Sequence, residues 1–303
     1  MAFLLDTDAA AMRAEGVVRV EGPDRLAYLH NLLSQDLESA APGDVRDFLY
    51  LDAKGNALAS GRAIVRATDV LLVVPREVAG SLTDALQRFT FLLQAGTEDL
   101  TPTWAVASVR GPGAVAVSGA PADQMRAADV GRGTLVRDRS GGVDVVGPAP
   151  WVEQQLVAVG LPRASSQDWE AWRISAGEPG WGSEITGGRR AQELGLLPTH
   201  VHLRKGCYPG QESIAKIYNL GRPRRILAVV ELAGEVGSGD PVTVAGKTGE
   251  ITSAVPAGAA WVALALLPAD SDGRVLGDGS VMVGTVPGRV RRRVGDGMAI
   301  PGA

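Results

Sequence analysis

The sequence contains a single cysteine, no basic excess and no long apolar run, and each absence excludes a class of protein. One cysteine, Cys207, cannot form a disulfide within the chain or build a thiolate zinc site alone. This fits a reducing compartment. The net charge of −4 argues against bulk neutralisation of nucleic-acid phosphates, which requires a clear excess of Lys and Arg. An indirect association with RNA stays open.

Membrane insertion is also unsupported. The longest apolar stretch, around Ala259–Leu267, is well short of the ~20 residues that span a bilayer. The N-terminus meets Asp6 almost at once and has no basic segment typical of a signal peptide. We therefore expect a cytoplasmic protein that has no membrane partner and binds no nucleic acid directly in bulk.

The composition is that of a folded, multi-part protein. Hydrophobic residues make up 45% and charged residues 21% of the 303 residues, which is ordinary for globular chains. In the first part, apolar patterns and turn residues alternate between strands and helices. The expected strands are Val17–Val20, Phe48–Leu51, Ala57–Val65 and Val70–Val74, with helices after Asp24, which is placed to cap the first one, and over Glu77–Leu93.

A similar cycle restarts at Val106–Val109, and Arg110-Gly111-Pro112-Gly113 echoes Glu21-Gly22-Pro23-Asp24. Beyond Arg225 only short strands punctuated by Gly, Pro and Asp are expected, which is typical of a small all-β unit. We therefore predict an α+β fold with two related α+β halves, divided near residue 105, within residues 1–225. A β-barrel or sandwich follows over residues 226–303.

The most informative segment is Arg204-Lys205-Gly206-Cys207-Tyr208-Pro209-Gly210-Gln211-Glu212. Its glycines and proline force an irregular backbone, which is where functional side chains tend to be presented. The thiolate is the reactive form of cysteine, and neighbouring cations such as Lys205 favour it. Free cysteines are often inert core residues, but this context favours a functional Cys207, with Lys205 as its partner in the chemistry.

The run Lys205-Gly206-Cys207-Tyr208-x-Gly210-Gln211-Glu212 resembles the signature of the YgfZ family. The resemblance implies a folate-binding protein that supports the assembly or repair of iron–sulfur proteins and the tRNA methylthiolation that depends on them. Asn219-Leu220-Gly221-Arg222-Pro223 resembles the continuation of this motif in actinobacterial members.

The wider superfamily includes the aminomethyltransferase of glycine cleavage, the T-protein. Its pattern R-L-E-A-G-x-x-x-x-G-N-D-I is similar to Arg173–Gly177 followed by Gly182-Ser183-Glu184-Ile185. A T-protein glutamate nine residues further on contacts the pterin, and Glu193 stands at that spacing. The resemblance covers nearly the whole chain and implies a ring of three parts around a central folate site.

The resemblance implies tetrahydrofolate or a derivative as the cofactor. A carboxylate suits a pterin because it accepts two adjacent N–H groups in a charge-assisted, bidentate way, and Glu193 is the preferred candidate. Arg222 is a candidate for the folate glutamate tail, through carboxylate–guanidinium pairing. Tyr208 could stack on the ligand or pack in the core. The full set of predicted cofactor-binding residues is Glu193, Glu184, Tyr208, Gln211, Glu212 and Arg222.

His200 and His202 precede the motif. On an extended segment, their two-residue spacing would place both side chains on one face. A metal site needs further ligands, and none is evident nearby. We therefore expect no metal site, and interpret both histidines as structural or as lining the site beside Cys207.

The leading hypothesis is a folate-dependent accessory factor for iron–sulfur proteins, with folate and iron–sulfur client or assembly proteins as partners. One cysteine cannot hold a cluster, which normally takes four thiolates, so any cluster contact would be transient or shared. One alternative is a tetrahydrofolate-dependent one-carbon transferase, and another is a passive folate-binding scaffold. Aminomethyl transfer is disfavoured, because the two aspartates of the T-protein pattern N-A-G-G-G-I-L-D-D align with Ala59 and Ser60.

Overall fold

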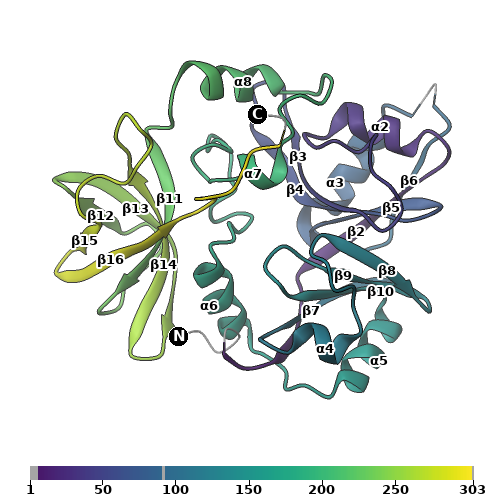
Figure 1. The fold of residues 1–303 in the computed structure, drawn as a ribbon, viewed down its shortest axis with the longest axis horizontal. Coiled ribbons are helices and arrows are strands. Elements are labelled where there is room, and N and C mark those ends of the chain that lie inside the picture. The colour runs from purple at the N-terminus through teal and green to yellow at the C-terminus, as the bar shows by residue number, and fades with distance from the viewer. Residues whose placement is uncertain (1–5, 91–92, 302–303) are drawn as a thin grey trace.

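The computed structural model describes residues 6–90 and 93–301, which form two antiparallel five-stranded sheets with their helices and a closed β-barrel (Figure 1). In Figure 1 the barrel lies on the left and the two sheets lie on the right, with helix α8 across the top and α6 and α7 between them. The predicted α+β class, with two related halves and a C-terminal barrel, is confirmed.

The first sheet has the strand order β3-β4-β5-β2-β6. Its face carries the apolar side of helix α3, where Val78, Leu82 and Leu86 are buried against Val18 and Leu72. The elements are β2 (Glu15–Glu21), α2 (Arg25–Leu32), β3 (Val45–Leu51), β4 (Ala57–Val65), β5 (Asp69–Pro75), α3 (Arg76–Gln87) and β6 (Gly96–Asp99).

The second sheet has the order β8-β9-β10-β7-β1. Trp151, Val152 and Leu156 of helix α5 pack on it in the same way that α3 packs on the first sheet. The elements are β1 (Ala9–Met12), β7 (Trp104–Arg110), α4 (Ala114–Ser118), β8 (Arg126–Val130), β9 (Gly133–Arg137), β10 (Val143–Pro148) and α5 (Ala149–Val159).

The two similar Gly-Pro turns lie at equivalent positions in the two halves. Gly22 and Gly111 follow β2 and β7, and both have positive φ, of 103° and 120°. A Cβ on Gly22 would lie 2.1 Å from the carbonyl oxygen of Gln94, just before β6, and one on Gly111 would lie 2.3 Å from the carboxylate of Asp8, just before β1. Strand β1 therefore occupies in the second sheet the place that β6 occupies in the first, although it lies at the other end of the chain.

The barrel closes in the order β11-β14-β13-β12-β15-β16. Three helices connect it to the halves: α6 (Ser166–Ala176), α7 (Leu197–His200) and α8 (Gln211–Leu220). Ser165 and Asp168 form a capping box at the start of α6. The barrel strands are β11 (Arg225–Leu232), β12 (Pro241–Val244), β13 (Lys247–Ala257), β14 (Ala260–Pro268), β15 (Ser280–Val283) and β16 (Val286–Arg293). The exact domain boundaries near residues 105 and 226 stay a prediction.

Two helix predictions need correction. Asp24 makes no side-chain cap; its carboxylate accepts a hydrogen bond from the backbone N–H of Gln94 at 2.8 Å and so holds the turn before β6. Helix α3 ends at Gln87 rather than Leu93, and Phe89 and Leu93 are exposed, so no core contact extends the helix that far. Residues 91–92 of the predicted helix lie outside the described part of the chain.

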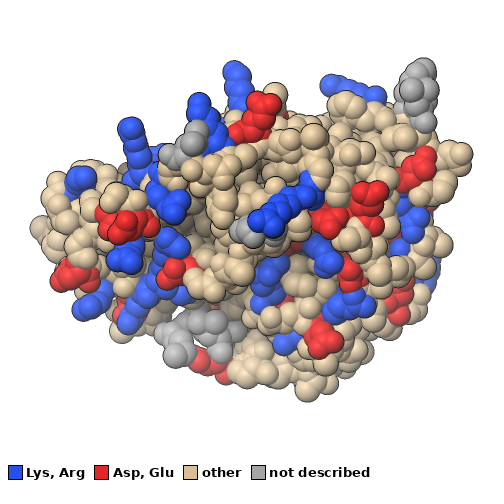
Figure 2. Space-filling view, turned by 45° about the horizontal axis from the view of Figure 1, so that its top comes forward, with Lys and Arg blue, Asp and Glu red and all other residues tan. Residues whose placement is uncertain are grey.

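Charges of both signs cover the surface. Figure 2 shows Lys and Arg side chains mixed with Asp and Glu over one face of the molecule. None of the described helices is both long enough and apolar enough to cross a membrane.

Candidate functional site

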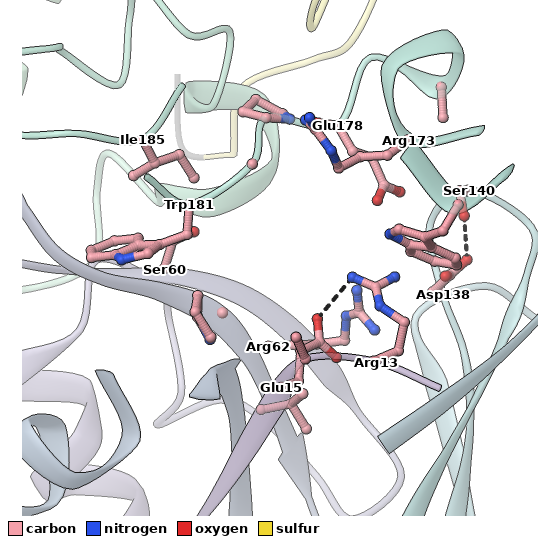
Figure 3. A pocket seen from close by; sticks show the side chains of 18 of the residues that line it. Arg13, Glu15, Ser60, Arg62, Asp138, Ser140, Arg173, Glu178, Trp181 and Ile185 are labelled. Carbon is pink, nitrogen blue, oxygen red and sulfur yellow. Dashed lines mark hydrogen bonds and ion pairs between the residues drawn. The ribbon is translucent and has the colours of Figure 1, made fainter. Parts of the chain in front are cut away.

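A large cavity lies where the two sheets, helix α6 with the loop after it, and the end of strand β16 meet. Its volume is about 1320 Å³, above the roughly 300–1,000 Å³ of most small-molecule sites. Figure 3 shows Arg13, Glu15 and Arg62 on one side of this space and Arg173 and Glu178 on the opposite side. The cavity is therefore roomy enough for an elongated, polar cofactor.

The floor of the cavity is a buried charge network that joins the two sheets. Arg62 on β4 pairs with Asp144 on β10, and its Nε lies 3.4 Å from Oδ1 of Asp47 on β3. Asp144 also accepts hydrogen bonds from Arg110 at 3.0 Å and from Ser108 at 2.6 Å. Burial alone would raise the pKa of Asp144, but Arg110, Arg62 and the Ser108 hydrogen bond outweigh it and hold that pKa well below its ordinary value.

His200 at the end of α7 lines the same cavity near Asp47. Burial lowers the pKa of His200 to about 4, although the charge of Asp47 opposes this shift. The imidazole is therefore neutral at physiological pH. His202 instead lines a separate small pocket of about 400 Å³. The predicted shared face is wrong, because α7 makes the backbone helical up to His200 and the two side chains diverge.

Aromatic rings and a cation form one side wall. The guanidinium carbon of Arg13 lies 3.4 Å from the centroid of the Trp169 ring on α6. Burial lowers the pKa of Arg13, while Glu15, whose carboxylate lies 3.3 Å from the guanidinium, opposes the shift. Trp181 and Ile185 line another part of the cavity, beside Ser60 in Figure 3. Aromatic rings and charged side chains therefore both line the cavity.

The loop after helix α6 holds Glu178 in place. Gly177 takes the left-handed conformation that ends the helix, with φ of 69°. The N–H of Glu178 donates to the carbonyl of Arg173 at 3.0 Å, and Nη1 of Arg173 donates to the carbonyl of Glu178 at 2.7 Å. Burial first, and then the nearby Asp138, raise the pKa of Glu178 to about 7 against the opposing charges of Arg110, Arg62 and Arg13.

The cysteine motif forms a separate site on the surface. Cys207 is exposed, in the loop that leads into α8. Gly210 has φ of 79°, and a Cβ there would lie 2.5 Å from the carbonyl oxygen of Asp52 in the β3–β4 turn. Only glycine allows this close approach. The loop therefore presents Cys207 outward while it is anchored on the first sheet.

Lys205 is the buried partner in this loop. Its ammonium group donates to the carbonyl of His30 at the end of α2 and lies 4.9 Å from the centroid of the Tyr208 ring. Burial lowers the pKa of Lys205 to about 8, while Asp36, Cys207 and Glu38 oppose the shift. Lys205 thus joins the cysteine loop to helix α2 and places a cation close to an exposed thiol.

The other motif residues lie around this loop. Tyr208 is buried in the core, and burial raises its pKa to about 12. The side chain of Gln211 accepts from the N–H of Tyr208 at 3.3 Å, and Glu212 is exposed in the first turn of α8. Arg222 is exposed, and its side chain donates to the carbonyl of Gly221 at 3.1 Å. None of these residues lines the large cavity.

Glu184 and Glu193 are likewise absent from the cavity lining. Glu184 is fully buried; it accepts from Arg173 at 2.9 Å and from Ser253 of the barrel at 2.6 Å. Glu193 accepts from the N–H of Arg190 and from Arg225, both at 3.2 Å. Both carboxylates therefore connect parts of the protein in this structure, and their predicted ligand roles stay predictions.

Sequence reasoning missed the residues that do line the cavity. These residues are charged and lie next to or within strongly apolar strands and helices: Arg13, Asp47, Arg62, Asp138 and Glu178. A charge embedded in an apolar strand is the sequence feature that could have identified such cavity residues. The partners of each charge come from distant segments, so the network itself could not be read from spacing. Within residues 6–90 and 93–301, no group of His, Cys, Asp and Glu side chains has the makings of a metal site.

The chain matches no family model. Its structure superimposes on the glycine-cleavage aminomethyltransferase T of Bartonella henselae with a TM-score of 0.79, over 95% of this chain and 85% of the other, at 17% sequence identity. The fold is therefore that of the aminomethyltransferases. At this identity the likeness concerns the fold alone.

Sequence relatives refine this placement. The tRNA-modifying protein YgfZ of Colwellia psychrerythraea is 25% identical over 75% of this chain and 72% of its own length. A mitochondrial iron–sulfur cluster assembly factor IBA57 homolog of Cryptococcus neoformans is 26% identical over 74% of this chain. A putative chloroplastic transferase of Arabidopsis thaliana is 27% identical over 78% of this chain. The chain spans 66% of the Cryptococcus protein and 59% of the Arabidopsis protein. The chain is a homologue of the proteins named YgfZ and IBA57, and the likeness to YgfZ is the one that its motif predicts.

Proposed function

We propose that this protein is a folate-dependent accessory factor for the assembly or repair of iron–sulfur proteins, including those that serve tRNA methylthiolation. The observation that carries the proposal is the large, polar and aromatic cavity at the centre of an aminomethyltransferase fold. The names of its YgfZ and IBA57 relatives support the link to tRNA modification and to iron–sulfur assembly.

The residues of the cavity fit a reduced folate. A bicyclic pterin can stack on the wall that holds Trp181, and its N–H groups need a carboxyl acceptor, which the cavity also supplies. Arg292, which donates to the backbone carbonyls of Ser175 and Ala176 and pairs with no described carboxylate, lines the same space and suits a carboxylate of a glutamate tail. A bound tetrahydrofolate would supply one-carbon or reducing chemistry, while the protein orients it and shields it from water.

The exposed cysteine is the contact point for a client. Cys207 projects from a loop that is fixed to the first sheet by Gly210 and to helix α2 by Lys205. A cluster normally takes four thiolates, so one thiol can contact a cluster only while a client or assembly protein supplies the other ligands. We infer that the cluster is cargo, shared for a short time between Cys207 and a partner protein.

Two measurements test the proposal together. Calorimetry with 5-formyltetrahydrofolate should show binding to the purified protein, and a deletion strain should lose activity of its iron–sulfur enzymes. The Cys207→Ser variant should fold normally, because the thiol is exposed, and should fail to restore those activities. Lack of folate binding by the wild type would remove the folate part of the proposal. Full complementation by the Ser variant would remove the role of Cys207.

A one-carbon transferase is the second candidate, and the word transferase in the name of the Arabidopsis relative favours it. Ser60 nevertheless lines the cavity at the place where the T-protein pattern has an aspartate, and Ala59 is buried in the core. A passive scaffold is the third candidate. It predicts that the Cys207→Ser variant complements fully.

A further inference from the structure

Glu178 is a carboxyl group in the cavity wall that pairs with no other described side chain. Its backbone is held by two hydrogen bonds with Arg173, in the turn that ends helix α6. Within the described residues, no hydrogen bond or ion pair engages its side-chain carboxyl group. The backbone is thus fixed, and the side chain is available to a ligand.

The charges around Glu178 are already committed to other groups. Arg62 pairs with Asp144 and Asp47, and Arg110 pairs with Asp144 and lies 2.5 Å from Asp138. Arg13 contacts Glu15 and the face of Trp169. The groups that act electrostatically on Glu178 are Asp138, Arg110, Arg62 and Arg13. Since these three arginines have carboxylate partners of their own, the carboxyl group of Glu178 stays available as an acceptor for a ligand.

We infer that Glu178 selects the ligand of the cavity, and that this ligand is a heterocycle with two adjacent N–H donors. This inference rests on the proposed function, because the pterin of a folate carries such a donor pair. Two parallel hydrogen bonds from the N–H groups to a carboxylate form the strong, bidentate arrangement that also fixes orientation. Sequence alignment with the T-protein points to Glu193 instead, which lies outside the cavity lining.

The selection should depend on pH. Only the ionised carboxylate accepts both N–H groups, and burial together with Asp138 raises the pKa of Glu178 to about 7. A ligand that binds the ionised form must therefore displace a proton at low pH. Linkage then predicts an affinity that is about ten-fold lower at pH 6 than at pH 8. His200 does not titrate in this range, since its pKa lies at about 4.

The test is calorimetry of 5-formyltetrahydrofolate with the wild type and with Glu178→Gln at pH 6 and pH 8. Glutamine keeps the shape of the side chain but cannot ionise. The variant should bind about ten- to hundred-fold more weakly at pH 8 and should lose the pH dependence. Glu153→Gln is the matched control: Glu153 lines the same cavity but pairs with Arg163 at 2.7 Å. This control should keep both the affinity and the pH response of the wild type.

The outcomes separate the two ideas. If the wild type binds and Glu178→Gln keeps its affinity or its pH response, the role of Glu178 is overturned while the folate proposal stands. If the wild type does not bind 5-formyltetrahydrofolate at either pH, both the folate proposal and the inference about Glu178 are overturned. Thermal unfolding of Glu178→Gln at pH 8 should match or exceed that of the wild type, because the substitution removes a carboxylate that is costly to ionise.

Discussion

Nε of Arg225 lies 3.2 Å from Oε1 of Glu193 and ties the first barrel strand, β11, to the segment before α7. The backbone strengthens this connection, because the N–H of Leu227 donates to the carbonyl of Glu193 at 2.7 Å. The second carboxylate oxygen of Glu193 accepts from the N–H of Arg190. A residue aligned with a pterin contact therefore joins the barrel to the rest of the chain.

The first prediction concerns Glu193→Gln. Because both oxygens serve protein donors outside the cavity, we expect the affinity for 5-formyltetrahydrofolate to change less than about two-fold. The pair with Arg225 is partly exposed, so the free energy of unfolding should fall by only about 0–1 kcal/mol. Calorimetry and denaturant unfolding measure the two effects. A ten-fold loss of affinity would return Glu193 to the pterin site.

The second prediction concerns the buried pair of Glu184 and Arg173. Glu184→Ala leaves the guanidinium of Arg173 without its buried partner, and should lower the free energy of unfolding by about 3–5 kcal/mol. Glu170→Ala is the matched control, since Glu170 also pairs with Arg173 but its side chain is 41% exposed; it should cost about 0–1 kcal/mol. Equal losses in the two variants would contradict a structural role specific to Glu184.

The class of fold could be predicted from the sequence because its signals are local. Strand and helix periods, the Gly-Pro turns at Gly22 and Gly111, and the Ser165 capping box each depend on neighbouring residues. Strand β16 and helix α8 went unpredicted, because β16 is rich in exposed Arg and α8 follows the Pro209-Gly210 turn.

The cavity was less accessible to sequence reasoning. Arg62 and Asp144 are 82 residues apart, and Arg110 and Asp144 are 34 apart. The local sequence pattern around each of these residues does not indicate which distant residue it pairs with. The cysteine loop, in contrast, is a continuous motif, and its exposed thiol and buried Lys205 follow from one segment.

The third prediction concerns Lys205 and pH. Burial lowers the pKa of Lys205 to about 8 in the folded protein from 10.5. A lowered lysine pKa means that the folded state binds its proton less tightly than the unfolded state does. Stability linked to this group is therefore present above the unfolded pKa and is lost as the pH falls through about 8.

Unfolding of the wild type and Lys205→Met at several pH values checks this sign. The wild type should gain stability relative to the variant as the pH rises from 7 to 10. The exposed Lys216→Met on α8 is the control and should show no such change. A constant difference between Lys205→Met and wild type across this range would show that Lys205 stays charged without cost.

The last prediction is that the protein does not catalyse aminomethyl transfer. Ala59 and Ser60 align with the two aspartates of the T-protein pattern; Ala59 is buried in the core and Ser60 lines the cavity. Neither side chain carries a charge that would stabilise a developing iminium or act as a carboxylate base.

The remaining acids of the cavity do not replace those aspartates. Asp47 on β3 lies opposite Arg62 on β4 and forms ion pairs with Arg62 and Arg139. The raised pKa of Glu178, about 7, keeps that carboxyl group largely protonated below neutral pH. We expect no methylenetetrahydrofolate above background when the protein is supplied with an aminomethyl-loaded lipoyl carrier and tetrahydrofolate. Turnover of about 1 s⁻¹ or more, the range of ordinary enzymes, would instead place the protein among the transferases. In that case the Glu178→Gln and Asp47→Asn variants would identify which carboxylate has taken over the role of the missing aspartate.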